Sequence, residues 1–167
     1  MKKRLIASIV TVVAVVGVFA GVAAASGGRP VVKAEGTETF QRNSLIEATF
    51  HWSSDVVSVP SGGAITFVST TAGEDPHTIT IAHQDQMPST IDDVFNCTVC
   101  NTALGHLDGN SSYDRDGDGG LSVPGDTWLL LPGQSLTVPV TASAGSTLYY
   151  LCAIHPWMQA TIHVTGG

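Results

Sequence analysis

Near its carboxyl end the chain reads Tyr149-Tyr150-Leu151-Cys152-Ala153-Ile154-His155-Pro156-Trp157-Met158 and continues Gln159-Ala160-Thr161-Ile162-His163-Val164. Two short runs of strand-type residues therefore flank a tight loop. Within seven residues this loop offers a thiol, an imidazole and a thioether, from Cys152, His155 and Met158. We expect two strands that hold three metal-binding side chains in fixed positions.

The donors of this loop favour copper. A thiolate, two imidazoles and a weak axial thioether form the trigonal site of blue copper proteins, because soft sulfur suits Cu(I) and imidazole accommodates Cu(II). The loop lacks one imidazole, and the best donor is His77 in the segment Asp75-Pro76-His77-Thr78-Ile79-Thr80-Ile81. Alternation along a strand places His77 on one face with Ile79 and Ile81. We expect this face to point inward and His77 to reach the end of a β-sandwich where Cys152 lies.

The spacing Cys-x2-His-x2-Met, preceded by aromatic strand residues and followed by a short strand, resembles the copper loop of the small cupredoxins, and amicyanin is closest in spacing. Pro76-His77-Thr78-Ile79 resembles the segment that supplies their other copper histidine. The resemblance covers roughly residues 56–164. It implies a cupredoxin-like Greek-key β-sandwich or barrel that carries one electron through Cu(II)/Cu(I) and exchanges it with redox partner proteins. The copper ligands that it implies are His77, Cys152, His155 and Met158.

Each of these residues also has a structural interpretation. Cys152 alone would be a small buried core residue, His77 a turn cap, and Met158 core filler. Trp157 is either buried packing or part of an apolar collar around His155 where a partner docks. The remaining histidines have no partner at ligand spacing and are interpreted as ordinary surface or half-buried residues: His51, His83, His106 and His163.

From residue 45 onward, short strand-type runs alternate with turns such as Pro60-Ser61-Gly62-Gly63 and Pro132-Gly133. Many short strands with glycine and proline turns and little helical periodicity are typical of an all-β sandwich or barrel. We predict one domain in residues 45–167, preceded by a flexible polar linker in residues 26–44. The expected strands are 46–52, 56–59, 64–69, 77–83, 127–131, 135–140, 147–152 and 160–164.

Residues 84–126 interrupt this pattern, and a segment of this length is too long for an idle loop in a compact domain. Cys97 and Cys100 lie in it, and a local disulfide between them would leave Cys152 as a free thiol. Two alternatives stay open: a disulfide from Cys152 to either cysteine, and a second metal site that includes His83 or His106. Residues 89–99 favour a helical turn or two.

The insertion also contains Asp114, Asp116 and Asp118, followed by Gly119. This spacing matches the opening of an EF-hand-type calcium loop. The match weakens afterwards, because the twelfth position is Gly125 and no amphipathic helix flanks the loop. A structural calcium ion and a solvated acidic turn are the two interpretations.

The first 25 residues have the features of an export signal. Met1-Lys2-Lys3-Arg4 precedes an apolar run from residue 5 to 25, and Ala23-x-Ala25 fits a cleavage site. We expect a periplasmic, cell-surface or extracellular protein, associated with a membrane only if this segment stays as an uncleaved anchor.

Removal of residues 1–25 leaves 142 residues, with four basic residues against all 14 acidic ones and a net charge of −10. Such a surface repels nucleic acid and favours a basic redox partner, although a negative charge is also a common aid to solubility. Multicopper oxidases and copper nitrite reductases need further sets of histidines, usually as His-x-His pairs. This chain contains no His-x-His pair. We therefore expect an electron carrier rather than an enzyme, with no small-molecule substrate. The alternative is a protein that delivers or buffers copper outside the cytoplasm.

Overall fold

The computed structural model describes residues 28–71 and 75–167, so the expected export signal lies outside the described residues. One set of strands comprises β1 (Val31–Glu35), β4 (His51–Trp52), β6 (Ala64–Ser69) and β10 (Ser135–Pro139). A second set comprises β5 (Val56–Pro60), β7 (His77–Ala82), β8 (Ser112–Tyr113), β9 (Thr127–Leu130), β11 (Thr147–Leu151) and β12 (Gln159–Thr165). The other elements are β2 (Glu38–Gln41), β3 (Leu45–Ala48), the 3-10 turn η1 (Gln84–Gln86), α1 (Ile91–Phe95) and α2 (Thr98–His106).

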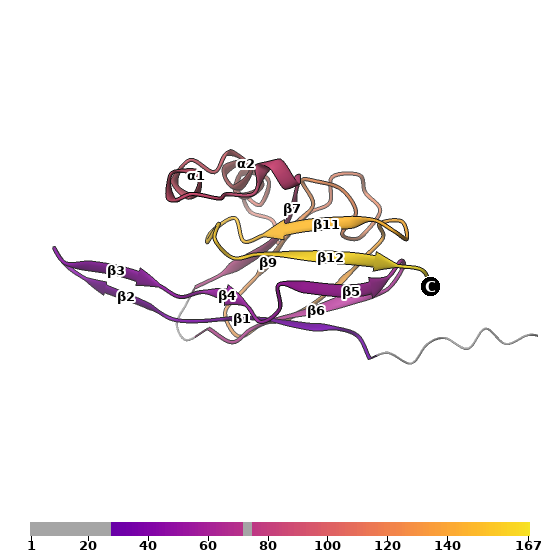
Figure 1. The fold of residues 1–167 in the computed structure, drawn as a ribbon, viewed down its shortest axis with the longest axis horizontal. Helices are drawn as coiled ribbons and strands as arrows, with labels where there is room; N and C mark the ends of the chain where they lie inside the picture. Colours follow the sequence, from indigo (N-terminus) through magenta and orange to yellow (C-terminus); the bar gives the residue numbers. More distant parts are fainter. Residues whose placement is uncertain (1–27, 72–74) are drawn as a thin grey trace, which may run out of the picture.

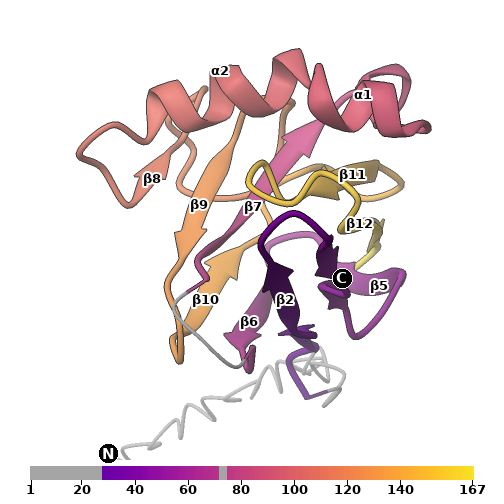
Figure 2. The same ribbon diagram turned by 90° about the vertical axis from the view of Figure 1, so that its left-hand side faces the viewer.

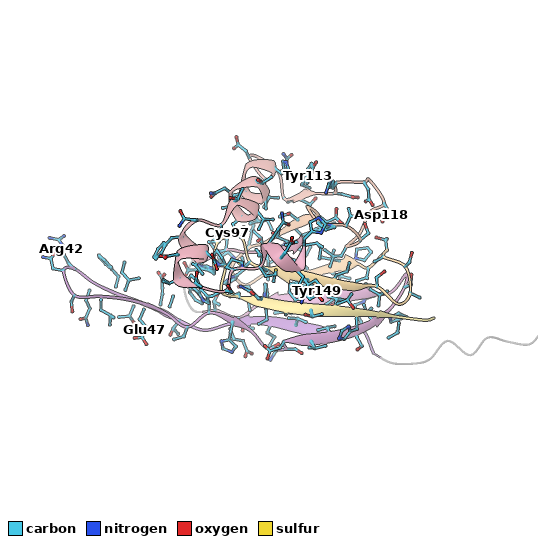
Figure 3. The ribbon with its side chains drawn as sticks, turned by 45° about the horizontal axis from the view of Figure 1, so that its top comes forward. Arg42, Glu47, Cys97, Tyr113, Asp118 and Tyr149 are labelled. Atoms are coloured by element: carbon cyan, nitrogen blue, oxygen red, sulfur yellow. A yellow bond between two sulfur atoms is a disulfide. The ribbon has the colours of Figure 1, made fainter. Side chains whose placement is uncertain are left out.

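Two sheets form a sandwich (Figure 1). The smaller sheet has the order β10-β6-β1-β4, and the larger sheet has the order β5-β12-β11-β7-β9-β8. β2 and β3 form a separate two-stranded ribbon that extends from the sandwich, with Arg42 at its tip (Figure 3). The prediction of an all-β sandwich with a partly irregular insertion is confirmed.

The core follows from strict alternation along the strands. In β6 and β12 every second side chain is buried, which places Ile65, Phe67 and Ile162 between the sheets. Trp52 and Tyr150 add large aromatic rings, whose centroids lie 5.6 Å apart. Burial of an isoleucine or phenylalanine side chain stabilises the folded state by roughly 1.5–3 kcal/mol. The sandwich therefore has a substantial core beneath its metal-binding end.

β7 is the most deeply buried strand, because both of its faces are covered. Its residues His77, Ile79 and Ile81 face the core, and Ala82 on the other face packs against the helical segment. Figure 2 shows α1 and α2 running across the strands of the larger sheet. The helices thereby hold the strand that carries His77 from outside.

The amino-terminal part of the domain differs from the expectation. We predicted a flexible linker in residues 26–44, and this is wrong for residues 31–41. β1 pairs in parallel with β6 and antiparallel with β4, and its Val32 and Ala34 are fully buried. β1 is too short to show a sustained hydrophobic period in the sequence. Its alternation is nevertheless enough to place the side chains of Val32 and Ala34 in the core.

The insertion is only partly irregular, because it contains two helices. Thr90 caps α1 by accepting a hydrogen bond from the Asp93 amide, and α2 follows after Asn96. The predicted helical turns therefore form, although Ile91 and Phe95 are largely exposed. α2 and the short strand β8 were not predicted. None of the helices in the described part of the chain is long and apolar enough to cross a membrane.

Candidate metal centre

The loop between β11 and β12 is closed by its own backbone. The Cys152 amide donates to the Met158 carbonyl over 3.0 Å, and the Met158 amide donates to the His155 carbonyl over 2.9 Å. The indole Nε1 of Trp52 also donates to the Met158 carbonyl, over 3.2 Å. Residues 152–158 are thus fixed at both ends and tied to the opposite sheet.

This loop meets the first residue of β7. The sulfur of Cys152 lies 3.8 Å from Nδ1 of His77 and 3.7 Å from Nδ1 of His155, and the two Nδ1 atoms are 3.2 Å apart. All three side chains are buried, and Met158 is buried in the same core cluster as Cys152. Three of the four residues singled out in the sequence, His77, Cys152 and His155, therefore come together.

The three polar atoms have the spacing of ligands around one ion. A point equidistant from them lies about 2.1 Å from each, which is close to common metal–nitrogen and metal–sulfur bond lengths. Two imidazole nitrogens and one sulfur in a trigonal arrangement, with a methionine nearby, suit copper better than the harder divalent ions. This is the donor set of a type 1 copper site. The chain resembles the cupredoxins in its sandwich and in this cluster.

Similar proteins are found among solved structures. No family model and no curated protein sequence matches the chain. Among solved structures, auracyanin A, a "blue" copper protein from Chloroflexus aurantiacus, is 16% identical, with a TM-score of 0.44 over 80% of this chain and 98% of that one. A purple cupredoxin from Nitrosopumilus maritimus is 15% identical, with a TM-score of 0.42 over 81% and 99%. Plastocyanin from Dryopteris crassirhizoma is 20% identical, with a TM-score of 0.39 over 80% and 98%.

Burial sets the protonation of the cluster. Desolvation, with a smaller effect of neighbouring His155, lowers the pKa of His77 from 6.5 to about 4, and desolvation also lowers the pKa of His155. Both imidazoles are therefore neutral at pH 7, which is the form that binds a metal. Burial raises the pKa of the Cys152 thiol, while backbone amides act in the opposite direction. A bound cation would favour the thiolate.

Hydrogen bonds hold the donor atoms in place. The amides of Thr78 and His155 donate to the Cys152 sulfur over 3.3 Å and 3.4 Å. The Thr78 hydroxyl accepts from the amide of Ala153 over 2.7 Å, which fixes the start of the loop to β7. Outer contacts of this kind orient ligands and tune a metal site. We did not predict a role for Thr78; its position next to His77 is the only signal in the sequence.

The two histidines differ in their access to solvent. His77 is fully buried, and its Nε2 lies 3.4 Å from the hydroxyl oxygen of Thr71. His155 keeps 8% of its surface exposed and is flanked by the rings of Phe50 and Trp157, at centroid distances of 4.6 Å and 5.4 Å. His155 is therefore the imidazole nearest the surface. The packing of Phe50 against it had no signal in the sequence.

Cys152 is a free, buried thiol, and Cys97 forms a disulfide with Cys100. The alternative disulfides from Cys152 do not form. His106 stacks on Tyr113 at a ring distance of 3.9 Å, and His51 lies near Glu35 at the surface. Neither histidine belongs to a group of metal-binding side chains in the described residues.

The acidic loop also gathers its carboxylates, since Asp114, Asp116 and Asp118 lie close together. Their oxygens are engaged by the loop itself: Asp114 accepts from the amides of Gly117 and Gly119. Such bonds are those of a tight polar turn, so calcium gains no support from this geometry. Within the described residues, the donor chemistry of His77, Cys152 and His155 supports copper.

Proposed function

We propose that the protein is an exported one-electron carrier in which His77, Cys152, His155 and Met158 hold a type 1 copper ion. One observation carries this proposal: a buried free cysteine sulfur lies 3.7 Å and 3.8 Å from Nδ1 of two buried, neutral histidines. Bound copper would supply a Cu(II)/Cu(I) couple. The chain supplies the donors, their orientation and their separation from water.

Rigidity of the donor set supports electron transfer. Pro156 restricts the loop and lacks an amide donor, and the loop is closed by the hydrogen bonds of Cys152 and Met158. A fixed set of two nitrogens and two sulfurs suits both oxidation states of copper. Little rearrangement then accompanies gain or loss of an electron, which keeps exchange fast.

The same burial argues against copper delivery as the main role. His77 and Cys152 are fully inaccessible to solvent, so a metal acceptor has no direct approach to them. Release would require the loop to open and its hydrogen bonds to break. An electron, in contrast, needs only the edge of His155 near the surface.

The surface around His155 suits a protein partner. Trp157 is 41% exposed and donates through Nε1 to the Phe50 carbonyl. At the same end of the molecule, Phe40 and Ile46 lie opposite each other on the β2–β3 ribbon and are mostly exposed (Figure 1). The acidic composition favours a partner with an apolar contact area and a basic rim. The disulfide of Cys97 is consistent with an oxidising, exported location.

The decisive experiment is the visible spectrum of the copper-loaded protein. We expect an intense absorption band from a copper–thiolate bond, and Cys152→Ser should abolish it. Cys97→Ser, which removes a cysteine outside the cluster, serves as the matched control and should leave the band. A Cu(II) protein without this band would contradict the proposal. Retention of copper through repeated oxidation and reduction separates a carrier of electrons from a carrier of copper.

A further inference from the structure

The disulfide in the insertion is not part of the group formed by His77, Cys152 and His155, and it has no role in electron transfer through that group. We propose that Cys97–Cys100 is a redox-active disulfide that exchanges with thiols of neutral or basic partners through the pocket beside it. This inference does not depend on copper. It rests on the position of Cys97 at the amino end of helix α2, on the pocket that Cys97 lines and Cys100 does not, and on the charges that line this pocket.

The bond closes a very short loop, since only Thr98 and Val99 lie between the two cysteines. The stabilisation that a disulfide gives by restricting the unfolded chain grows with the length of the loop it closes. Here this gain is among the smallest possible. A purely structural role therefore explains little of why two cysteines are placed at this position.

The position of Cys97 stabilises a thiolate. Cys97 is the N-cap of the nine-residue helix α2, and its sulfur accepts a hydrogen bond from the Cys100 amide over 3.3 Å. The amino end of a helix carries partial positive charge. Cysteine at such a position forms a thiolate more readily, and a stabilised thiolate makes the reduced state easier to reach.

The two sulfurs differ in surroundings. Cys97 lines a surface pocket of about 450 Å³, and Figure 3 shows this residue at the helical segment. Both cysteines are buried in one small apolar cluster with Leu151 and Ala153, but Cys100 does not line the pocket. Cys97 is thus the sulfur that an incoming thiolate can attack, and Cys100 is the leaving sulfur.

The pocket also selects by charge. Asp85 and Asp93 line it, and no lysine or arginine is among its lining residues in the described chain. Hydrogen bonds from Ser89 and Thr90 lower the pKa of Asp93, so its carboxylate is ionised at neutral pH. Two carboxylates beside the sulfur disfavour anionic thiols and favour thiols that carry no charge or a positive charge.

The exchange balances as a two-electron reaction. A partner thiolate attacks the Cys97 sulfur, the bond between the two protein sulfurs breaks, and Cys100 leaves as a thiolate that takes up a proton. A second partner thiolate attacks the partner sulfur of the mixed disulfide, and Cys97 leaves as a thiolate that also takes up a proton. Two partner thiols become one disulfide, while the protein disulfide gains two electrons and two protons.

The first test measures the equilibrium. Copper-free full-length protein and a synthetic peptide of residues 95–102 are equilibrated in the same series of glutathione buffers and quenched by alkylation. Peptide mass analysis then separates Cys97 and Cys100 from Cys152. We expect the folded protein to be half-reduced in a buffer about tenfold less reducing than the peptide requires. A folded protein that stays oxidised where the peptide is reduced would identify a structural bond and overturn the proposal.

The second test uses matched variants. Cys100→Ser leaves the sulfur at the pocket as a free thiol, and Cys97→Ser leaves the sulfur of Cys100, which does not line the pocket. With an aromatic disulfide reagent, we expect the first variant to react at least about tenfold faster than the second, with circular dichroism as the check on folding. Equal rates would contradict the assignment of Cys97 as the attacked sulfur and Cys100 as the leaving sulfur. The glutathione equilibrium of the wild-type protein tests the proposal even if neither variant folds.

The third test addresses charge selection on the wild-type protein. Rates of reduction by cysteamine, which is cationic, and by mercaptoethanesulfonate, which is anionic, are each divided by the rate with the peptide. We expect the cationic thiol to be favoured by about fivefold at low salt, and Asp85→Asn to reduce this preference. An unchanged ratio would exclude the pocket as the route of attack. The visible spectrum of copper-loaded protein is read separately, so failure here does not affect the copper proposal.

Discussion

At the scale of single residues, the Cys152 sulfur is subject to two opposing effects. Its burial raises the pKa of the thiol, and the amides of Thr78 and His155 donate hydrogen bonds that stabilise the thiolate. Without a cation, burial is the larger effect. Copper bound by His77 and His155 would reverse the balance, so copper uptake should release a proton from this residue.

Met158 offers a prediction about redox balance. A weak axial thioether stabilises Cu(II) more than Cu(I), because Cu(I) tolerates fewer ligands, and the axial ligand tunes the potential of such sites. We expect Met158→Leu to keep the visible band and to raise the reduction potential, as measured by redox titration. Met87→Leu removes a thioether from the other apolar cluster and is the matched control. A potential that falls, or that shifts equally in both variants, would contradict an axial role for Met158.

The buried histidines predict how the stability of the metal-free protein varies with pH. The pKa of His77 is lowered from 6.5 to about 4, chiefly by desolvation and only partly offset by Asp75, so the unfolded state binds a proton more readily. The free energy of unfolding should therefore be highest above pH 6.5 and fall as the pH drops from 6.5 towards 4. The loss expected from His77 is about 3 kcal/mol, and His155 changes stability in the same direction.

Denaturant unfolding of the metal-free protein at a series of pH values measures this effect. His77→Gln should flatten the dependence between pH 6.5 and 4. Carboxylates with lowered pKa, such as Asp93 and Asp114, act below this window, because their ordinary pKa is 3.8. A free energy of unfolding that stays constant between pH 7 and 4.5 would show that the histidines are not desolvated.

At the scale of elements, the crossing from β1 to the ribbon depends on one glycine. Gly36 has φ +126°, and a Cβ there would lie 2.7 Å from the Thr49 carbonyl oxygen and from the Phe50 Cα. Phe50 in turn packs on His155. The close approach of these two segments thus connects the base of the ribbon to the copper loop.

We expect Gly36→Ala to destabilise the protein by about 1–3 kcal/mol, because it adds both backbone strain and a clash. Gly62→Ala is the control, since Gly62 also has positive φ but its Cβ would meet no neighbour within 4 Å. Thermal or denaturant unfolding gives both values. Similar losses in the two variants would mean that the contact with Phe50 adds nothing to the strain.

At the scale of the whole molecule, charge governs encounters. The chain has 14 acidic and seven basic residues, and three of the basic residues lie in the expected signal. We expect the copper protein to react with a small cationic redox complex, hexaammineruthenium, at a rate that falls several-fold as ionic strength rises from about 10 mM to about 500 mM. The rate with anionic ferricyanide should rise over the same range. Stopped-flow kinetics measure both, and the same salt dependence for the two reagents would exclude electrostatic steering.

Prediction from the sequence succeeded where a local pattern decides the structure. The alternation in residues 64–69 and the turn at Pro60-Ser61-Gly62-Gly63 correspond closely to β6 and the turn before it. It failed where pairing is decided by distant segments. β1 becomes a strand because β6 and β4 are available on either side, and residues 46–52 divide into β3 and β4 because the chain leaves the ribbon and enters the sheet.

The sequence by itself determined the donor types, the spacing of Cys152, His155 and Met158 on one loop, and the inward face of the strand that begins at His77. Only the tertiary structure decided that the imidazole of His77 meets the sulfur of Cys152, and that Phe50 covers His155. The physical reason is range. Spacing along a strand or loop is fixed by local backbone geometry, whereas contacts between residues 75 positions apart exist only after the two sheets have packed and buried their common core.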